Sequence, residues 1–387
     1  MISRTIQAEL ESLLTEYPVV TITGPRQSGK TTLARMTCPD YQYCNLEDPE
    51  VRHLALTDPK GFFNQYRRPL IIDEIQRVPG LLSMVQVLVD QDKTKGSFLL
   101  TGSEQLSLKK SVSQSLAGRT ALLTLLPLSI LELRESGLLV SRDELILKGF
   151  LPRVYSESLT PFKAYRNYFQ TYIERDLVQQ MNVRNILHFE NFVRLLAGRT
   201  GQVINLHSMS NDLGVSSTTL GEWLSVLEAS WLVFRLPPYF SNQRKRIIKS
   251  PKIYFTEIGL VSYLLGLETP LQVARDPLIG GIFENMVVIE ALKARLNQGR
   301  DPELYFYRDN NRNEIDLIFR NHQDLIPIEI KSAMTWHESL SKSIRFFDNT
   351  FGSSEKGFLV YSGTQTFESD RYTVISYEDI YKVFDRQ

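Results

Sequence analysis

The run with the clearest chemical potential lies near the start of the chain and reads GPRQSGKT from Gly24 to Thr31. Its two glycines, with the lysine and threonine after the second, have the spacing of a phosphate-binding loop. Glycine lets the backbone turn so that N–H groups point at phosphate oxygens, while Lys30 can reach the β- and γ-phosphates and Thr31 can ligate Mg²⁺. The pattern predicts ATP and Mg²⁺ as cofactors. The expected cofactor-binding residues are Gly24, Pro25, Arg26, Gln27, Ser28, Gly29, Lys30, Thr31 and Thr32.

A pair of acids follows farther along the chain, at the end of the apolar run Leu70–Ile72. A buried strand that ends in Asp73 and Glu74 delivers both carboxylates to the carboxyl edge of a sheet, where ligands of open α/β sheets bind. Asp73 is then placed to hold Mg²⁺ together with Thr31, which gives the expected metal residues. Glu74 is placed to orient and polarise the attacking water, so we expect it to be catalytic.

Two further candidates follow later segments. The strand predicted over Ser97–Leu100 ends in the sequence TGS, where the hydroxyl of Thr101 or Ser103 can contact the γ-phosphate or the water; a simple strand-ending turn is the alternative. Arg119 precedes another predicted strand, at a point far from its own nucleotide along the sheet edge. It can instead reach the nucleotide of a neighbouring subunit as an arginine finger, the alternative being a surface arginine. Ser103 and Arg119 therefore join Glu74 as expected catalytic residues.

A sheet is needed to position these residues, and the first half of the chain alternates strand and helix signals. Short apolar runs separated by segments of helical spacing indicate a parallel sheet covered on both faces. The expected strands are Val19–Thr23, Tyr41–Leu46, Pro69–Ile72, Ser97–Leu100 and Thr120–Leu126. The second half begins as helices, and strands return at Leu304–Arg308, Glu314–Phe319 and Leu325–Ile330. The expected fold class is α/β.

Composition narrows the class of protein. The chain has 387 residues, 42% of them apolar and 23% charged, a globular mixture that predicts two or three domains. The 44 basic and 44 acidic residues cancel, so global charge neither supports nor opposes a nucleic-acid partner. Cys38 and Cys44 are too few for a disulfide framework or a zinc site. The N-terminus has the pattern of an amphipathic helix, and no apolar run approaches a membrane span, so we expect a cytoplasmic protein without membrane contact.

The middle of the chain predicts a helix-turn-helix, with a helix over Leu206–Leu213, a turn at Gly214 and a second helix that starts at Ser216. Two short strands, Trp231–Leu236 and Lys252–Phe255, can form a wing. Such a module places its second helix in the major groove of DNA and its wing on phosphates, although winged helices also bind proteins. The candidate DNA contacts are Ser216, Ser217, Thr218 and Thr219 on the helix, and Arg244, Lys245, Arg246 and Lys249 on the wing.

The tail carries a second group of acids. Asp316 lies on one predicted strand, while Glu329 and Lys331 share a face of the next strand because strand side chains alternate. Glu284 lies on the preceding helix. This pattern resembles the PD-(D/E)xK nuclease fold, in which two acids bind Mg²⁺ and a lysine stabilises the attacking hydroxide. The resemblance implies a metal site made of Glu284, Asp316, Glu329 and Lys331, and it leaves open whether the tail cleaves nucleic acid or is only a scaffold.

Together these motifs resemble the AAA-type ATPases of bacteria and archaea. The segments that carry the resemblance are GPRQSGKTTL, LIIDEIQ, LLTGSEQ, SLAGRT and LPLSILEL. The second half resembles the domain of unknown function that accompanies this family, through GFLPRVY, YFQTYIERDL and the block FEN…NEIDLIF…IPIEIKSA. The resemblance implies an ATPase that forms a ring or other homo-oligomer, with Ser103 as its sensor and Arg119 acting in trans. Arg153 and Arg175 are further candidates to reach a nucleotide from a lid or a neighbour. The compact lid of well-studied AAA proteins is hard to place in this sequence.

These features predict three domains: an AAA-type ATPase domain over residues 1–135, a helical lid with a winged helix over 136–270, and a nuclease-like domain over 271–387. We expect an enzyme that hydrolyses ATP to ADP and couples turnover to DNA binding or remodelling. Two alternatives stay open. One is an ATP-gated switch for protein interaction or signalling without a nucleic-acid substrate, and the other is an ATP-fuelled, Mg²⁺-dependent nuclease.

Overall fold

The structure is a computed structural model that describes residues 2–103, 115–171, 186–239, 250–311, 313–352 and 355–385. Its contacts divide the chain into two compact units. The first comprises Met1–Leu128 with the short pieces Ala229–Trp231 and Leu296–Arg300, and the second comprises Ser129–Glu228, Leu232–Arg295 and Asp301–Gln387. The finer division into three domains stays a prediction. No helix in the described ranges has both the length and the apolar character needed to cross a membrane.

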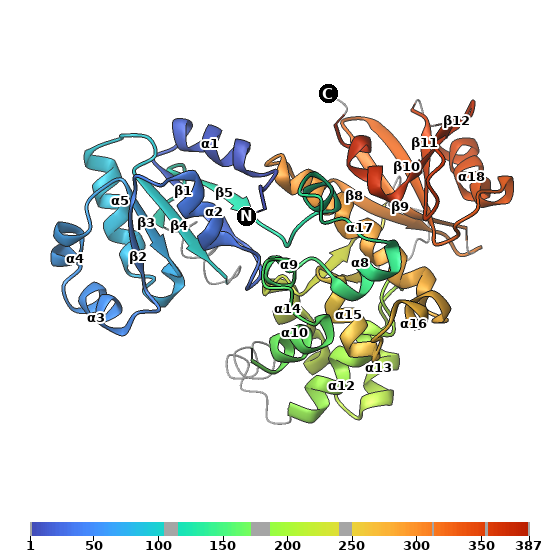
Figure 1. The fold of residues 1–387 in the computed structure, drawn as a ribbon, viewed down its shortest axis with the longest axis horizontal. Coiled ribbons are helices and arrows are strands. Elements are labelled where there is room, and N and C mark those ends of the chain that lie inside the picture. Colours follow the sequence, from blue (N-terminus) through green and yellow to red (C-terminus); the bar gives the residue numbers. More distant parts are fainter. Residues whose placement is uncertain are drawn as a thin grey trace. The chain divides into compact units, whose positions relative to one another are not determined.

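A parallel sheet of five strands in the order β2-β3-β4-β1-β5 forms the centre of the first unit (Figure 1). The strands are β1 (Val19–Thr23), β2 (Gln42–Asn45), β3 (Leu70–Asp73), β4 (Phe98–Gly102) and β5 (Thr120–Thr124). Every residue of β1, β3 and β4 is buried. This explains why these strands are continuous apolar or β-branched runs, since a parallel sheet is covered on both faces. The predicted α/β class with an N-terminal parallel sheet is confirmed.

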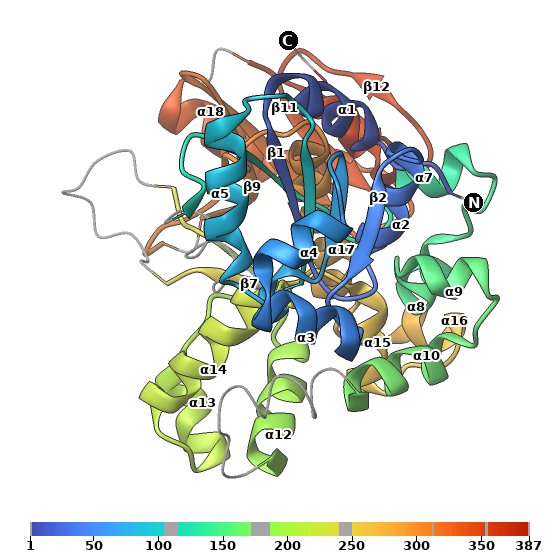
Figure 2. The same ribbon diagram turned by 90° about the vertical axis from the view of Figure 1, so that its left-hand side faces the viewer.

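Helices cover both faces of this sheet, as Figures 1 and 2 show from two directions. On one face, α1 (Gln7–Glu16) and α2 (Lys30–Thr37) place Ile6, Leu10, Leu33 and Ala34 in a cluster with Val20, Ile22 and Leu99. On the other, α3 (Pro49–Thr57), α4 (Pro59–Gln65) and α5 (Leu81–Gln91) pack Ala55, Phe62 and Val85 against Val19, Ile72 and Leu100. Neighbouring residues of one strand thus serve opposite cores.

The sequence analysis missed α3 and α4, although both have clear start signals. Asp48 caps α3 by accepting from the backbone N–H of Glu50 at 2.9 Å, and Asp58 caps α4 by accepting from Gly61 at 2.9 Å. In each case a proline follows the cap as the first helical residue. Aspartate before proline is a standard way to begin a helix, because the proline lacks the N–H that would otherwise be unsatisfied.

The second unit begins with helices. Its first half contains α7 (Ile130–Glu135), α8 (Arg142–Lys148), α9 (Pro152–Ser156), α10 (Pro161–Tyr168), α12 (Ile186–Ala197), α13 (Leu206–Leu213), α14 (Ser217–Ala229), α15 (Ile258–Leu265) and α16 (Pro270–Arg275). Strands β6 (Val233–Leu236) and β7 (Lys252–Phe255) form an antiparallel pair. The predicted helix over 162–181 is described only from Pro161 to Tyr168 as α-helix, and its later residues lie mostly outside the described ranges.

A six-stranded mixed sheet in the order β12-β13-β11-β10-β9-β8 makes up the rest of the second unit. Its strands are β8 (Leu304–Arg308), β9 (Glu314–Asn321), β10 (Asp324–Lys331), β11 (Gly357–Tyr361), β12 (Phe367–Glu368) and β13 (Tyr372–Ser376). The helices α17 (Ile279–Asn297) and α18 (Lys342–Phe351) accompany it, with short 3₁₀ segments at Glu338–Ser341 and Tyr377–Val383. Strands β9 and β10 are antiparallel neighbours, which decides the positions of the tail acids.

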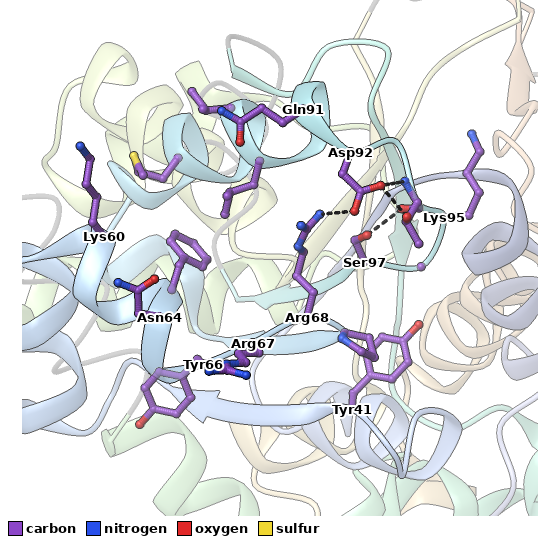
Figure 3. Close-up of a pocket in the computed structure, with 17 residues that line it drawn as sticks. Tyr41, Lys60, Asn64, Tyr66, Arg67, Arg68, Gln91, Asp92, Lys95 and Ser97 are labelled. Carbon is purple, nitrogen blue, oxygen red and sulfur yellow. Dashed lines mark hydrogen bonds and ion pairs between the residues drawn. The ribbon is translucent and has the colours of Figure 1, made fainter.

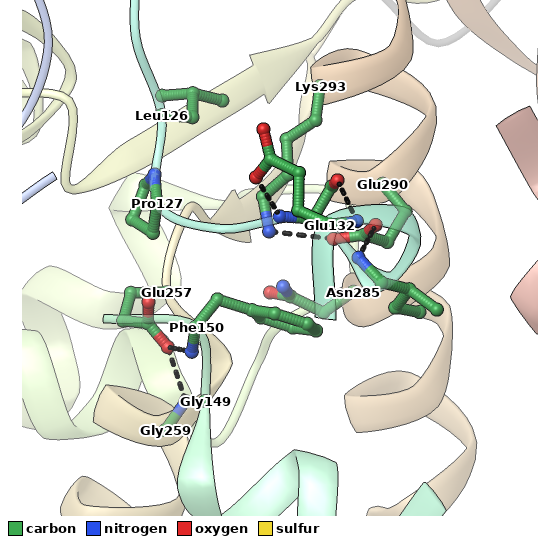
Figure 4. A network of polar contacts seen from close by, with 12 residues as sticks. Leu126, Pro127, Glu132, Gly149, Phe150, Glu257, Gly259, Asn285, Glu290 and Lys293 are labelled. Atoms are coloured by element: carbon green, nitrogen blue, oxygen red, sulfur yellow. Dashed lines mark hydrogen bonds and ion pairs between the residues drawn. The ribbon is translucent and has the colours of Figure 1, made fainter. Parts of the chain in front are cut away.

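A buried polar network ties the start of the second unit to α17 (Figure 4). Glu290 accepts from the backbone N–H of Ile130 at 2.7 Å and from the ammonium of Lys293 at 2.7 Å. That ammonium also lies 3.7 Å from the ring centre of Phe150. Glu257 accepts from the N–H of Phe150 at 2.8 Å. Buried charges persist in a core only when they are paired and hydrogen-bonded, and the Glu290–Lys293 pair meets both conditions.

Candidate nucleotide-binding site

The loop predicted to bind phosphate joins β1 to α2. Gly24 follows β1 with a φ of 145°, and a Cβ there would lie 2.1 Å from the carbonyl oxygen of Leu125. Gly29 has a φ of 93° and immediately precedes the first residue of α2. Both positions therefore require glycine. At Gly24 the backbone of Leu125, just after β5, leaves no room for a Cβ, and at Gly29 the backbone is left-handed. The loop's amide groups and the N-terminus of α2 together form a suitable place for an anion.

Lys30 and Ser28 show that this loop fits a phosphate group. The Lys30 ammonium donates to the carbonyls of Gly24 at 3.1 Å and Pro25 at 2.8 Å, and burial lowers its pKa to about 8. A buried ammonium held only by neutral carbonyls favours an additional anionic partner. The Ser28 hydroxyl is buried and has no hydrogen-bond partner among the described residues. The loop thus has both a cation and a spare hydroxyl for phosphate oxygens.

Asp73 is the centre of a hydrogen-bond cluster at the carboxyl ends of the strands. Its Oδ2 accepts from the Thr31 hydroxyl at 2.9 Å, and its Oδ1 accepts from the Thr101 hydroxyl. The structure therefore brings together the two residues expected to hold Mg²⁺. A third donor, the hydroxyl of Tyr43 on β2, contacts the same Oδ2 at 2.9 Å. The sequence analysis missed Tyr43, because the register that pairs β2 with β3 is a tertiary property.

Glu74 stands just beyond β3 with a left-handed φ of 57°, which is unusual for a residue with a side chain. Its backbone N–H donates to Thr101 at 3.3 Å, and its carboxylate accepts from the Ser103 hydroxyl at 3.4 Å and from the Gln76 amide. Gln76 also donates to Ser103 at 3.1 Å. The acid expected to orient water and the sensor candidate are thus adjacent, and Gln76 bridges them. Gln76 lies in the quoted DEIQ segment, but its bridging role was not predicted.

Arg4 is another residue that the sequence analysis did not select. Its guanidinium donates to the carbonyl of Ser28 in the phosphate loop at 2.7 Å and to the carbonyl of Leu126 at 2.6 Å. The side chain is only 9% exposed. Arg4 therefore fixes the loop's backbone to the segment after β5. No spacing rule links it to the loop, because the N-terminal segment reaches this place only in the folded chain.

Two of the arginines proposed to act on a nucleotide have acidic partners in their own unit. Arg119 forms a two-point ion pair with Asp90, at 2.6 Å and 2.9 Å, on the surface of the first unit. Arg153 pairs with Glu157 one turn along its own segment, at 2.9 Å, and its side chain is 57% exposed. Arg175 lies outside the described residues. A role for any of them in trans stays a prediction.

The tail acids gather around two lysines. Lys331 contacts Asp316 at 3.4 Å and also pairs with Glu329, so the three strand residues of the resemblance meet at β9 and β10. Asp316 also accepts from the N–H of Ile330 at 2.9 Å. Glu284 contacts a different cation, Lys252 of β7, at 2.9 Å. Lys252 was predicted only as a wing residue, yet it is 1% exposed.

The electrostatics of this tail cluster differ from those expected of a plain metal site. Lys252 also pairs with Glu314 at 2.5 Å, and Tyr254 donates to Glu284 at 2.6 Å. Burial raises the pKa of Glu284 to about 7 and that of Glu329 to about 8. Within the described ranges, no three His, Cys, Asp or Glu side chains are grouped to hold a metal. Ammonium groups already provide the positive charge that a divalent cation would bring.

The helix-turn-helix segments have the predicted positions. Gly214 ends α13 with a left-handed φ of 66°, and Ser216 caps α14 by accepting from the N–H of Thr219 at 3.1 Å. Two nearby arginines are already paired, Arg199 with Asp212 at 2.6 Å and Arg235 with Glu228 at 2.8 Å. The four basic wing candidates, Arg244, Lys245, Arg246 and Lys249, lie outside the described residues.

Three family models match this chain. Residues 16–134 match an AAA domain, while residues 141–271 and 279–380 match two domains of unknown function, DUF8612 and DUF4143. The uncharacterized protein Rv2008c of Mycobacterium tuberculosis is 34% identical over 346 residues, which cover 88% of this chain and 76% of that protein. The uncharacterized protein MJ1544 of Methanocaldococcus jannaschii is 23% identical over 359 residues, covering 84% and 78% of the two chains.

Solved structures provide more distant likenesses. The Walker-type ATPase PABY2304 of Pyrococcus abyssi aligns with a TM-score of 0.43 at 12% identity, over 68% of this chain and 96% of that one. The Holliday junction branch migration motor RuvB of Thermotoga maritima aligns with a TM-score of 0.32 at 20% identity, over 61% and 90% of the two chains. Both scores are too low to transfer an activity.

Proposed function

Since this chain belongs to the same family as the Mycobacterium tuberculosis protein Rv2008c and carries an AAA-type P-loop ATPase domain, we propose that it binds Mg²⁺-ATP and hydrolyses it. The observation that carries the proposal is the contact between Thr31 of the phosphate loop and Asp73 at the end of β3. A hydroxyl and a carboxylate in contact beside a lysine-bearing loop form the protein's half of a Mg²⁺-nucleotide site. Bound Mg²⁺ would neutralise developing phosphate charge.

The chain's own residues then have separate roles. Lys30 binds the β- and γ-phosphates, because its ammonium is held inside the loop by the carbonyls of Gly24 and Pro25. Asp73 and Thr31 hold the metal. Glu74 accepts the hydrogen bond of the attacking water and orients it, and Ser103 contacts the γ-phosphate or that water. Arg4 keeps the loop's backbone in place through its contact with Ser28.

The direct test is Lys30→Ala, measured by equilibrium binding of a fluorescent ATP analogue with Mg²⁺. Tight binding should be lost, since the variant lacks the buried ammonium that lies against the loop carbonyls of Gly24 and Pro25. Lys163→Ala provides the matched control, because Lys163 is an exposed lysine on α10. Equal affinity of Lys30→Ala and wild type would overturn the proposal.

We propose in addition that ATP turnover is coupled to nucleic acid and that the protein works as a homo-oligomer in which Arg119 serves a neighbour's site. The α13–turn–α14 arrangement supports nucleic-acid contact, since its exposed Ser216, Ser217 and Thr218 precede or begin the second helix. The test is the ATPase rate with duplex, forked and single-stranded DNA. Rates that no DNA form changes would favour the alternative, an ATP-gated switch that binds protein.

A further inference from the structure

A groove of about 850 Å³ lies in the first unit at the edge of the sheet opposite the phosphate loop. Residues just before β2, β3 and β4 line it, among them Tyr41, Arg67, Arg68 and Lys95. Parallel strands begin at one edge of a sheet and end at the other, and these strands pair in parallel. Asp73, Glu74 and Ser103 follow the strand ends, so the groove is separate from the nucleotide site. Its volume is in the range of ligand-binding clefts.

The groove is strongly basic. Four cations line it, Lys60, Arg67, Arg68 and Lys95, against the single acid Asp92. Arg68 is paired with Asp92 at 3.3 Å. The side chains of the other three cations have no hydrogen-bond or ion-pair partner within the described ranges, and Figure 3 shows them around the same space. In a chain whose charges cancel overall, this is a local positive field of the kind that attracts polyanions.

Aromatic and apolar side chains alternate with these cations. Tyr41, Phe63 and Tyr66 are half-buried at the groove, and Val87 of α5 is 48% exposed there. Surfaces that bind single-stranded nucleic acid combine a positive track for phosphates with aromatic rings on which bases stack. An acidic peptide would use the cations but would have little use for these half-buried rings.

We propose that this groove binds a single-stranded nucleic acid, with Lys60, Arg67 and Lys95 on phosphates and the tyrosine rings beside bases. The proposal deepens the coupling to nucleic acid proposed above and rests on it, because it names the surface where the strand is held. Strand β3 begins beside Arg68 and ends at Asp73, so four residues, about 13 Å, separate groove and catalytic edge. A ligand that orders the start of β3 and β4 can therefore act on the residues at their ends.

The test measures binding of a fluorescein-labelled oligothymidylate by the full-length protein, using fluorescence anisotropy across a salt series. The groove variant reverses three exposed cations, Lys60→Glu, Arg67→Glu and Lys95→Glu. The matched control makes the same charge change on exposed residues of the second unit, Lys163→Glu, Arg166→Glu and Arg275→Glu. Losing three phosphate contacts should reduce the slope of log affinity against log salt concentration by about 2. Between about 50 and about 200 mM salt, the wild type should therefore lose roughly 20-fold more affinity than the groove variant. The control should follow the wild type.

The outcomes separate this proposal from the function on which it rests. A wild type that binds no oligonucleotide at low salt overturns the groove, whereas ATPase rates that no DNA form changes overturn the coupling on which it rests. A wild type that binds, with a groove variant of equal affinity and equal salt slope, overturns the groove while leaving coupling intact. Binding of a polyglutamate peptide in place of the oligonucleotide assigns the groove to a protein partner. Basal ATPase activity, measured without DNA, should be the same in wild type and groove variant, which shows that the variant is folded.

Discussion

The hydroxyl of Tyr43 donates a 2.9 Å hydrogen bond to Oδ2 of Asp73, the same oxygen that accepts from Thr31. Tyr43 lies on β2 and Asp73 at the end of β3, where the two strands pair in parallel. Thr31 is also the residue expected to ligate Mg²⁺. Tyr43 is therefore the donor that can hold the carboxylate in place while Thr31 engages the metal.

Tyr43→Phe should raise the Mg²⁺ concentration needed for half-maximal ATP hydrolysis by roughly 10- to 100-fold, because a hydrogen bond to a charged group contributes about 1.5–3 kcal/mol. The measurement is a Mg²⁺ titration of the steady-state rate at saturating ATP. Tyr41→Phe is the control, since Tyr41 lies just before the same strand without contacting Asp73. An unchanged titration curve would show that Tyr43 does not position Asp73.

Glu74→Gln should bind Mg²⁺-ATP like the wild type and lose turnover by about 10²–10⁴-fold, the contribution usual for a positioned general base. Single-turnover hydrolysis and nucleotide binding, measured on one preparation, separate the two effects. Gln76→Ala is informative beside it, because Gln76 donates to the Glu74 carboxylate and the variant leaves that carboxylate in place. Wild-type turnover in Glu74→Gln would remove Glu74 from the mechanism.

Arg119→Ala should lower ATP hydrolysis by roughly 10³-fold if the arginine completes a neighbour's site. Mixing it with Glu74→Gln should restore part of the rate, since the second variant supplies an intact Arg119. Asp90→Asn, which removes the partner of Arg119 but keeps the arginine, should retain activity. Absence of rescue in a protein shown to be multimeric would contradict the role in trans.

Lys252→Met should destabilise the second unit by about 3–5 kcal/mol, because it leaves Glu284 and Glu314 near each other without their shared ammonium. Urea unfolding provides the measurement. Lys356→Met is the control, since its ion pair with Glu368 is exposed and should contribute about 0–1 kcal/mol. Equal losses in the two variants would mean that the buried pairs contribute no more than a surface pair.

The tail should not cleave DNA in the presence of Mg²⁺ or Mn²⁺, because the buried Lys252, which is not part of the nuclease pattern, already pairs with Glu284 and Glu314. Incubation of wild type and Asp316→Ala with plasmid and with single-stranded DNA checks this. Cleavage present in the wild type and absent in Asp316→Ala would establish a nuclease. Cleavage common to both would come from a contaminant.

The sequence by itself determined the phosphate loop and the parallel sheet of the first unit. The loop could be identified because its backbone geometry depends on Gly24 and Gly29. Both glycines lie in one short segment, so their spacing can be recognised from the sequence. The strands could be predicted because burial on both faces leaves an apolar run, and β1 was placed with the bounds that the structure has. Both features can be recognised from residues that are neighbours in the sequence.

Only the tertiary structure decided which side chains stand around these motifs. Arg4 donates hydrogen bonds to the carbonyls of Ser28 and Leu126, and Tyr43 donates one to Asp73. Lys252 forms an ion pair with an acid of the tail, Glu284. Each contact joins segments brought together by sheet register or helix packing, and no fixed spacing connects them. The basic groove likewise collects residues from the starts of three strands and from two helices. Such relationships depend on how distant elements pack, because a residue's own neighbours in sequence say nothing about its partners across a sheet.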